Sequence, residues 1–433
     1  MMTSTTDPAT VGATVAAYCR DEQFDDLEKL FAPNLRAAVS AETVRVSWRS
    51  ELAKIGAVAE LGEPRTEPIA GGLTRVGIPV HCEHGGMTLV VAVDDTGALQ
   101  GFRLAPPPAT WTPPRYASER KLTEHEITLG PAESEVPATL TLPRGHGPCP
   151  AVVLVSSGPV DADLTVGPNK PFKDLAWGLA TRGVAVLRYD KSTRVHPESA
   201  TRPGFTMVDE YLPNAIAAVC FLRQHERIDP ERVFLAGHSG GGKAVPRVAA
   251  AEPAVAGLVI MAGDTVSMPY SAIRAARYLA GPDPDPTTRA AADAFIRQAE
   301  ATDSPGLTPD TPATELLFGW PASYWLDLRA YDQAKTTASL DIPILVLQGA
   351  RDYQVTVAED LPGWQAALAD RPNAAFRTYA ADDHMFFPGT GPSTPAQYEE
   401  PNHVDPAVIA DIADWVGAGR RGPLAAVRKA FGR

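Results

Sequence analysis

The sequence of 433 residues predicts an α/β protein: a doubly wound, mostly parallel sheet with a helical cap insertion, preceded by a small α+β domain. Two observations predict this class. From about residue 121 onward, continuous apolar runs, typical of strands covered on both faces, alternate with helical patterns. Before residue 105, helical spacing comes first and strand-like stretches follow. A proline-rich segment over 106–120 is expected to be an extended linker.

The first domain is expected over 8–105 and combines two helical regions with a meander of strands. Helical apolar spacing occupies 11–31 and 41–56, and strand-like stretches follow at 72–80, 87–93 and 99–104. The sequence Asp-Asp-Thr-Gly over 94–97 is a hairpin signal between the last two stretches. Helices followed by a meander predict a small α+β roll.

The second domain is expected over 121–418 and repeats strand and helix. Strands are predicted at 127–129, 138–142, 151–155, 184–188, 233–236, 258–262, 344–348 and 375–379. Helices are predicted at 172–182, 209–225, 242–251, 359–370 and 408–416. This repetition indicates a mostly parallel sheet with helices on both faces. The stretch 266–340 interrupts the pattern, is rich in helix and proline, and is predicted to be the inserted cap.

A glycine-rich turn holds the candidate nucleophile. Gly237, Ser239 and Gly241 form a Gly-x-Ser-x-Gly motif between a core strand and a helix. A serine in such a turn has a strained backbone that directs its hydroxyl out of the sheet edge, and the glycines remove Cβ atoms that would clash there. The motif alone is a weak signal, but its place between strand and helix makes Ser239 the predicted nucleophile.

A nucleophilic serine needs a base, and the base needs an orienting acid. Asp352 and His384 each follow one of the last two predicted strands, in the chain order Ser, acid, His that this topology uses. We therefore predict them as acid and base; Asp264 is the alternative acid and His403 the alternative base. Structural roles are expected for the other polar residues near these motifs: packing for His238, loop shaping for Asp382 and Asp383, and a loop network for Lys170, Asp174 and Asp190.

Backbone N–H groups are the expected donors to the oxyanion. The N–H of Gly240 directly follows the serine, and a second donor should come from the loop after strand 151–155. Ser157 is the first choice for that donor and Gly158 the second. Two readings, an acyl pocket and packing within the cap, are open for three aromatic residues late in the insertion: Trp320, Tyr324 and Trp325.

Composition argues against several other classes of function. The 39 basic and 52 acidic residues give a net charge of −13, and such a surface repels the phosphates of nucleic acids. The four cysteines lie far apart without a CxxC pair, which predicts reduced thiols and no zinc cage. His81 and His84 flank Cys82, where exposed imidazoles at a strand end are expected and a metal site is the alternative. No metal and no cofactor are expected.

A cytoplasmic enzyme is expected. The first twenty residues lack the pattern of a signal peptide, and no apolar run reaches the ~18 residues that a membrane span needs. The basic tail over 419–433 is expected to be a solvated terminus, with contact to an anionic surface as the alternative. The first domain is a candidate for homodimerisation or for covering the site.

Several stretches over about 120–418 carry a family resemblance: 167–176, 186–191, 237–242, 323–327, 349–355 and 403–405. In these the chain resembles α/β-hydrolases, and more narrowly bacterial carboxylesterases of the EstD type. The segment before residue 105 is similar to a small cystatin-like domain often fused to such hydrolases. Two residues depart from the usual pattern: Ser156 stands where relatives have glycine, and Gly240 stands where they have a bulky apolar residue.

The resemblance implies Ser239 as nucleophile, His384 as base and Asp352 as orienting acid. It also implies hydrolysis of short-chain acyl esters without a cofactor. Our main hypothesis is hydrolysis of an ester or thioester of a small acyl substrate through an acyl-enzyme. The two departures motivate an alternative in which the same serine serves an acyltransferase, a cyclase or another tailoring enzyme of specialised metabolism. A non-catalytic binding protein on a hydrolase fold is the remaining alternative.

Overall fold

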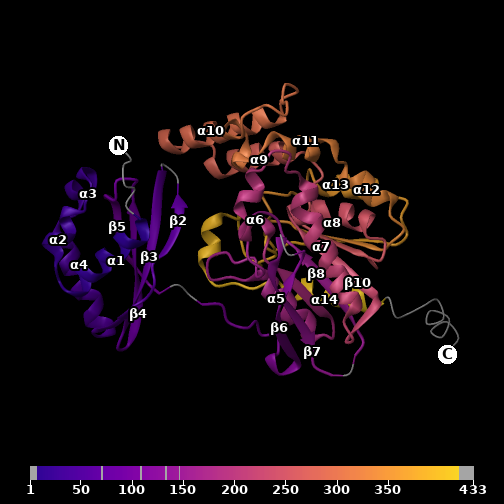
Figure 1. The fold of residues 1–433 in the computed structure, drawn as a ribbon, viewed down its shortest axis with the longest axis horizontal. Coiled ribbons are helices and arrows are strands. Elements are labelled where there is room, and N and C mark those ends of the chain that lie inside the picture. Colours follow the sequence, from indigo (N-terminus) through magenta and orange to yellow (C-terminus); the bar gives the residue numbers. More distant parts are fainter. Residues whose placement is uncertain (1–6, 70–71, 108–109, 132–133, 146, 419–433) are drawn as a thin grey trace. The chain divides into compact units, whose positions relative to one another are not determined.

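The computed structural model describes residues 7–69, 72–107, 110–131, 134–145 and 147–418 (Figure 1). The basic tail expected over 419–433 lies outside these residues. Contacts divide the chain into two compact units, Met1–Thr110 and Trp111–Arg433. The second half of the expected linker, from Trp111 onward, belongs to the second unit, because Trp111 packs edge-on against Trp177 with ring centroids 5.1 Å apart.

The first unit packs helices against an antiparallel sheet. Its elements are α1 (Pro8–Arg20), α2 (Phe24–Lys29), α3 (Pro33–Ala38), α4 (Ala41–Ile55), β1 (Val58–Leu61), β2 (Arg65–Ile69), β3 (Leu73–Cys82), β4 (Gly85–Val93) and β5 (Leu99–Ala105). The strand order is β1-β3-β4-β5, and β2 also pairs with β3. Alternate residues of β3 and β4, among them Val76, Ile78 and Val91, are buried in one core with Val15 and Cys19 of α1.

The sequence pattern misses some details of this unit. The single helix expected over 11–31 is wrong: α1 and α2 are separate, because the chain turns at Glu22, which has a φ of +57°. The elements α3, β1 and β2 were not predicted. They are short, and most residues of β2 are exposed, so they lack the apolar alternation that identifies a strand.

The second unit contains an eight-stranded sheet. Its strands are β6 (Leu122–Leu129), β7 (Val136–Pro143), β8 (Cys149–Val155), β9 (Ala185–Tyr189), β10 (Ile228–His238), β11 (Leu258–Met261), β12 (Ile344–Gly349) and β13 (Ala374–Tyr379). The order is β13-β12-β11-β10-β8-β9-β7-β6. The pairs from β13 to β9 are parallel, and β7 is antiparallel to both β9 and β6. The eight strands predicted from the sequence are all present, and the sheet is mostly parallel as expected.

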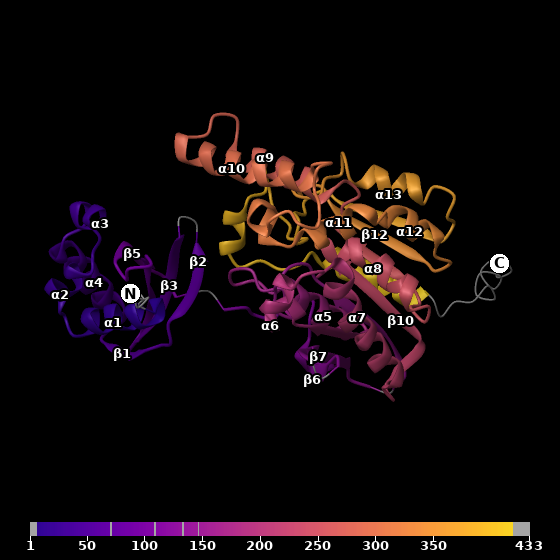
Figure 2. The same cartoon turned by 45° about the horizontal axis from the view of Figure 1, so that its top comes forward.

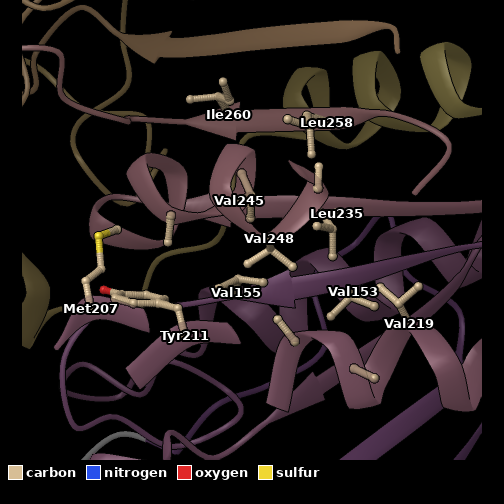
Figure 3. Packing of buried hydrophobic residues seen from close by; sticks show 14 of the residues in the cluster. Val153, Val155, Met207, Tyr211, Val219, Leu235, Val245, Val248, Leu258 and Ile260 are labelled. Carbon is tan, nitrogen blue, oxygen red and sulfur yellow. The ribbon is translucent and has the colours of Figure 1, made fainter. Parts of the chain in front are cut away.

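Helices cover both faces of this sheet. They are α5 (Pro171–Thr181), α6 (Ser192–Val195), α7 (Met207–Gln224), α8 (Gly240–Ala251), α13 (Leu361–Ala367) and α14 (Pro406–Ala418). Successive residues of β8 point to opposite sides: Val153 and Val155 pack with α7 and α8 (Figure 3), whereas Val152 and Leu154 pack with α5 and α14. Burial on both faces explains why the strands read as continuous apolar runs. Because the central strands are parallel, their carboxyl ends meet at one edge of the sheet.

The insertion between β11 and β12 is mostly helical. It contains α9 (Met268–Ala280), α10 (Pro286–Asp303), two short 3-10 turns (Ala313–Glu315 and Leu317–Gly319), α11 (Ala322–Ala330) and α12 (Gln333–Ser339). Helices α9 and α10 pack against each other (Figure 2). Within the stretch 266–340 that the sequence assigns to a cap, α12 packs on α8 and α13, and its Thr337 is buried.

Across the described residues, none of the helices combines the length and the apolar character that crossing a membrane requires. All four cysteines are free: Cys19 and Cys82 are buried, while Cys149 and Cys220 are partly exposed.

Candidate active site

Ser239 occupies a strained turn between β10 and α8. Its φ of +56° and ψ of −123° lie in a region that residues other than glycine rarely adopt. Glycines make the turn possible: a Cβ at Gly237 would lie 2.2 Å from the carbonyl oxygen of Gly241, and a Cβ at Gly241 would lie 2.0 Å from that of Val155. The N–H of Ser239 donates to the carbonyl of Met261 over 2.9 Å and ties the turn to β11. The motif thus forms the sharp strand-to-helix turn that its sequence predicts.

Asp352 and His384 come together at the same edge of the sheet. Asp352 follows β12, His384 follows β13, and His384 Nδ1 lies 2.7 Å from Asp352 Oδ2. Both side chains are buried. The other carboxylate oxygen, Oδ1, accepts hydrogen bonds from the N–H groups of Gln354 and Val355 over 2.8 and 2.9 Å. The carboxylate is therefore fixed in orientation before it meets the imidazole.

This pairing decides the tautomer and the charge preference of His384. Because Nδ1 faces a carboxylate, it carries the proton and donates it, which leaves Nε2 as an acceptor. Burial by itself lowers the pKa of His384, but the negative charges of Asp352 and Asp383 outweigh it, so the pKa lies above its ordinary value. The imidazole is thus a stronger base than a free histidine.

His238 connects the serine turn to the His384 loop. Its Nε2–H donates to the carbonyl of His384 over 2.7 Å, and the two rings lie 4.7 Å apart. Burial and the neighbouring His384 lower the pKa of His238 to about 3, so it is neutral. His384 therefore sits beside the residue that immediately precedes Ser239. Within the described chain no hydrogen bond joins the Ser239 hydroxyl to His384, a link that is often long in unliganded enzymes.

A cavity of about 510 Å³ opens at this edge of the sheet. Its walls come from the serine turn, the loop after β8, α7, the cap and the loop after β12. It is lined by Ser157, Gly158, Pro159, Tyr211, Ser239, Gly240, Asp264, Met268, Ser271, Ala272, Ala275, Phe318, Trp320, Tyr324, Trp325, Gln354 and Val355. Such a volume suits a small organic ligand, and most of these side chains are apolar or aromatic.

The residues expected at the oxyanion and in the pocket all line this cavity. Ser157 and Gly240 lie close together, since a Cβ at Gly240 would come within 3.0 Å of the Cβ of Ser157. Both expectations for the three cap aromatics hold, because Trp320, Tyr324 and Trp325 line the cavity and also pack against one another. The ring of Tyr324 packs edge-on against Trp320, with centroids 4.2 Å apart, and against Trp325, with centroids 5.6 Å apart.

The alternative acid and base take other partners. Asp264 lines the cavity, but its carboxylate pairs with the buried Lys243 over 2.8 Å. Burial raises the pKa of Asp264 despite this partner. His403 Nδ1 lies 3.2 Å from both carboxylate oxygens of Asp174, a residue that also accepts from Trp111 Nε1. Neither Asp264 nor His403 contacts the Asp352–His384 pair by a hydrogen bond within the described residues.

The other polar residues singled out in the sequence have local partners. Lys170 pairs with Asp163 over 2.8 Å, and Asp190 accepts from the N–H of Ala162 over 2.8 Å. Asp383 accepts from two backbone N–H groups of its own loop. His81 and His84 are exposed, and the described residues contain no group of three or more His, Cys, Asp or Glu side chains arranged to hold a metal ion.

Three features of the site are not predicted by the sequence pattern. Tyr211 of α7 lines the cavity, and a buried cluster of Lys191, Glu210 and Tyr324 lies behind it. The segment 207–224 shows only a helical pattern, so nothing in its spacing assigns Tyr211 to a site. The sequence pattern also gives no sign of Lys243, which pairs with Asp264, because it does not show which buried charged side chains come into contact.

No protein-family model matches the chain. Among solved structures it is similar to Est1E from Butyrivibrio proteoclasticus, with a TM-score of 0.43, 16% identity and coverage of 67% of this chain and 99% of that one. The esterase domain of a Rhodothermus marinus protein is similar at a TM-score of 0.40, with 17% identity and coverage of 69% and 98%. Likenesses of this size do not specify function.

One curated protein is a closer relative in sequence. Over 416 residues the chain is 31% identical to Esterase EstD of Thermotoga maritima, and the match covers 92% of this chain and 93% of that protein. The match extends over nearly the full length of both chains. The chain therefore belongs to the family of Esterase EstD, and it is an esterase-type hydrolase of the α/β-hydrolase class.

Proposed function

We propose that the protein hydrolyses carboxylic esters or thioesters of small acyl substrates through a Ser239–His384–Asp352 triad and an acyl-enzyme. The observation that carries this proposal is the meeting of the strained serine turn with the buried Asp352–His384 pair at one edge of the sheet. His238, which precedes the serine and donates to the carbonyl of His384, holds the two parts together.

The proposed reaction has an acylation step and a deacylation step. The Ser239 oxygen attacks the acyl carbon while His384 Nε2 takes its proton, and Asp352 stabilises the imidazolium that forms. The N–H groups of Gly240 and Ser157 donate to the oxyanion. His384 then gives its proton to the leaving alcohol or thiol as the bond to the acyl carbon breaks. Water, activated by the same nitrogen, releases the acid and restores the serine.

The lining of the cavity suits an uncharged acyl group, so we propose that the acyl part of the substrate binds there. Its walls are mostly apolar, and the charge of Asp264 is balanced by Lys243. Trp320, Tyr324 and Trp325 supply the aromatic side of this proposed acyl pocket. Burying an acyl chain there contributes roughly 0.8 kcal/mol for each methylene.

Replacing the nucleophile tests the proposal. Ser239→Ala should abolish hydrolysis of p-nitrophenyl butyrate and labelling by a fluorophosphonate. Ser339→Ala, which alters an exposed serine of α12, is the matched control and should keep both. Wild-type turnover by Ser239→Ala would refute the assignment. Product analysis with an added alcohol or amine should yield free acid alone, and transfer of the acyl group would favour the acyltransferase alternative.

We also propose that the first unit is a cystatin-like domain. Its support is a helical layer, dominated by α1 and α4, packed on one face of an antiparallel sheet. Homodimerisation and a cytoplasmic location stay predictions from the sequence.

A further inference from the structure

Gly240 touches two side chains that other elements bring to it. A Cβ at this position would lie 2.9 Å from the hydroxyl oxygen of Tyr211 and 3.0 Å from the Cβ of Ser157. The first distance is shorter than side chains tolerate, so a larger residue would push the tyrosine away. The glycine at 240 therefore does not leave an empty space. The Tyr211 hydroxyl takes the place where a side chain would begin.

The position of this hydroxyl relates it to the oxyanion. Gly240 and Ser157 are the two proposed backbone donors, and the Tyr211 hydroxyl lies beside both residues, since it and the Ser157 Cβ are each within 3.0 Å of the place that a Cβ of Gly240 would take. All three residues line the cavity that holds Ser239. A carbonyl oxygen that accepts from the N–H of Gly240 would thus be next to a phenol O–H.

Buried contacts fix the Tyr211 ring (labelled in Figure 3) in this place. The ammonium of Lys191 lies 3.5 Å from the centre of the ring, and it also pairs with Glu210 over 3.3 Å. The other oxygen of Glu210 accepts from the Tyr324 hydroxyl over 2.7 Å. Because the single proton of Tyr324 is given to Glu210, the Tyr324 oxygen accepts from the neighbouring Tyr211 hydroxyl in the free site. These four side chains are at least 97% buried. The oxygen of Tyr211 is thus already in place, and only its O–H bond has to rotate from Tyr324 toward the oxyanion when the transition state forms.

The hydroxyl keeps its proton at neutral pH. Burial, reinforced by the negative charge of Glu210, raises the pKa of Tyr211 well above 10. A phenol that stays protonated can donate a hydrogen bond but cannot act as a base.

We infer that the Tyr211 hydroxyl is a third donor to the oxyanion, beside the N–H groups of Gly240 and Ser157, and that Gly240 is small so that this hydroxyl can reach the site. The inference rests on the proposed function. Tyr211 is then a catalytic residue, because its hydroxyl touches the reacting oxygen. Unlike a backbone donor, it can be removed by substitution.

Tyr211→Phe removes the hydroxyl and keeps the ring over Lys191. We expect kcat for p-nitrophenyl butyrate to fall at least tenfold, toward the roughly 10²-fold loss typical of one oxyanion donor, with KM changed less than threefold. Tyr189→Phe is the matched control, since its buried hydroxyl has no hydrogen-bond partner in the described chain and does not line the cavity. It should keep the wild-type kcat. A fall of less than tenfold in Tyr211→Phe, or a loss confined to KM, would overturn the inference.

A double-mutant cycle tests the role given to Gly240. Gly240→Ala should lower kcat in the wild-type background, where the new Cβ displaces the Tyr211 hydroxyl. It should cost much less in Tyr211→Phe, where that hydroxyl is absent. Equal losses in the two backgrounds would contradict the link between the residues.

Labelling separates this inference from the proposed function. Tyr211→Phe should still react to completion with a fluorophosphonate, but more slowly, whereas Ser239→Ala should not react. Turnover by Ser239→Ala refutes the triad. Normal kcat and labelling rate in Tyr211→Phe, with an inactive Ser239→Ala, refute only the third donor.

Discussion

His384 Nδ1 lies 2.7 Å from Asp352 Oδ2, and neither side chain is exposed. Gln348 also donates to this oxygen from its side chain, over 3.3 Å. The carboxylate is therefore held by the chain on every side, and the imidazole takes its orientation from it.

Asp352→Asn should reduce kcat with little change in KM. The amide removes the negative charge that stabilises the imidazolium and permits the wrong tautomer of His384. A loss on the order of 10⁴-fold is typical of this change in a serine triad. Steady-state kinetics with p-nitrophenyl butyrate measure it. Asp370→Asn, at an exposed position, is the control and should match the wild type. A loss below about a hundredfold would contradict the assigned role.

The pH dependence should reflect His384 acting as a base. Only neutral imidazole accepts the proton of Ser239, so kcat/KM should fall as the pH drops through the pKa of His384. The carboxylates of Asp352 and Asp383 raise this pKa above its ordinary value of 6.5, so the midpoint should lie above pH 6.5. A profile from pH 5 to 9 measures it. In Asp352→Asn the midpoint should move to lower pH, and a wild-type midpoint below 6.5 would contradict the prediction.

Ala275→Phe should narrow the acyl pocket. Ala275 of α9 lines the cavity, so a phenyl ring there displaces part of a long acyl chain. We expect kcat/KM for p-nitrophenyl octanoate to fall at least about tenfold more than for the acetate. Ala276→Phe, at the next residue of α9, does not line the cavity and serves as the control. Equal losses on both esters would argue against an acyl chain in this space.

Asp382→Asn should stabilise the folded protein at neutral and alkaline pH but not at acidic pH. Burial, and then the neighbouring Asp405, raises the pKa of Asp382 from 3.8 to about 7. Between these values the unfolded chain has released the proton that the folded chain still holds, so the stability of the wild type falls as the pH rises. Asparagine does not titrate and avoids this loss.

Thermal unfolding at two pH values measures the effect. The melting temperature of Asp382→Asn should exceed that of the wild type by at least about 2 °C at pH 8, the shift that roughly 1 kcal/mol produces. At pH 4 the two proteins should melt alike. Asp310→Asn, at an exposed position, controls for the general loss of one charge. A gain that is the same at both pH values would disprove the titration of Asp382.

Much of the second unit was predictable from local sequence. Apolar runs identified its strands, because residues buried on both faces of a parallel sheet leave no polar alternation. The serine turn was predictable because only glycines tolerate its close backbone contacts. Asp352 and His384 were placed at one edge by the rule that parallel strands end together. In the first unit the same reasoning missed β1 and β2, whose short and exposed segments carry little pattern.

Only the tertiary structure decided which polar groups meet. Asp264 could have oriented the histidine, but it pairs with Lys243, and His403 lies against Asp174 instead. The approach of Tyr211 to Gly240 depends on how α7 packs beside the serine turn. The physical reason is that periodicity and turn chemistry act between near neighbours in the chain and can be read along it. A contact between two elements depends instead on the packing of every side chain that separates or joins them.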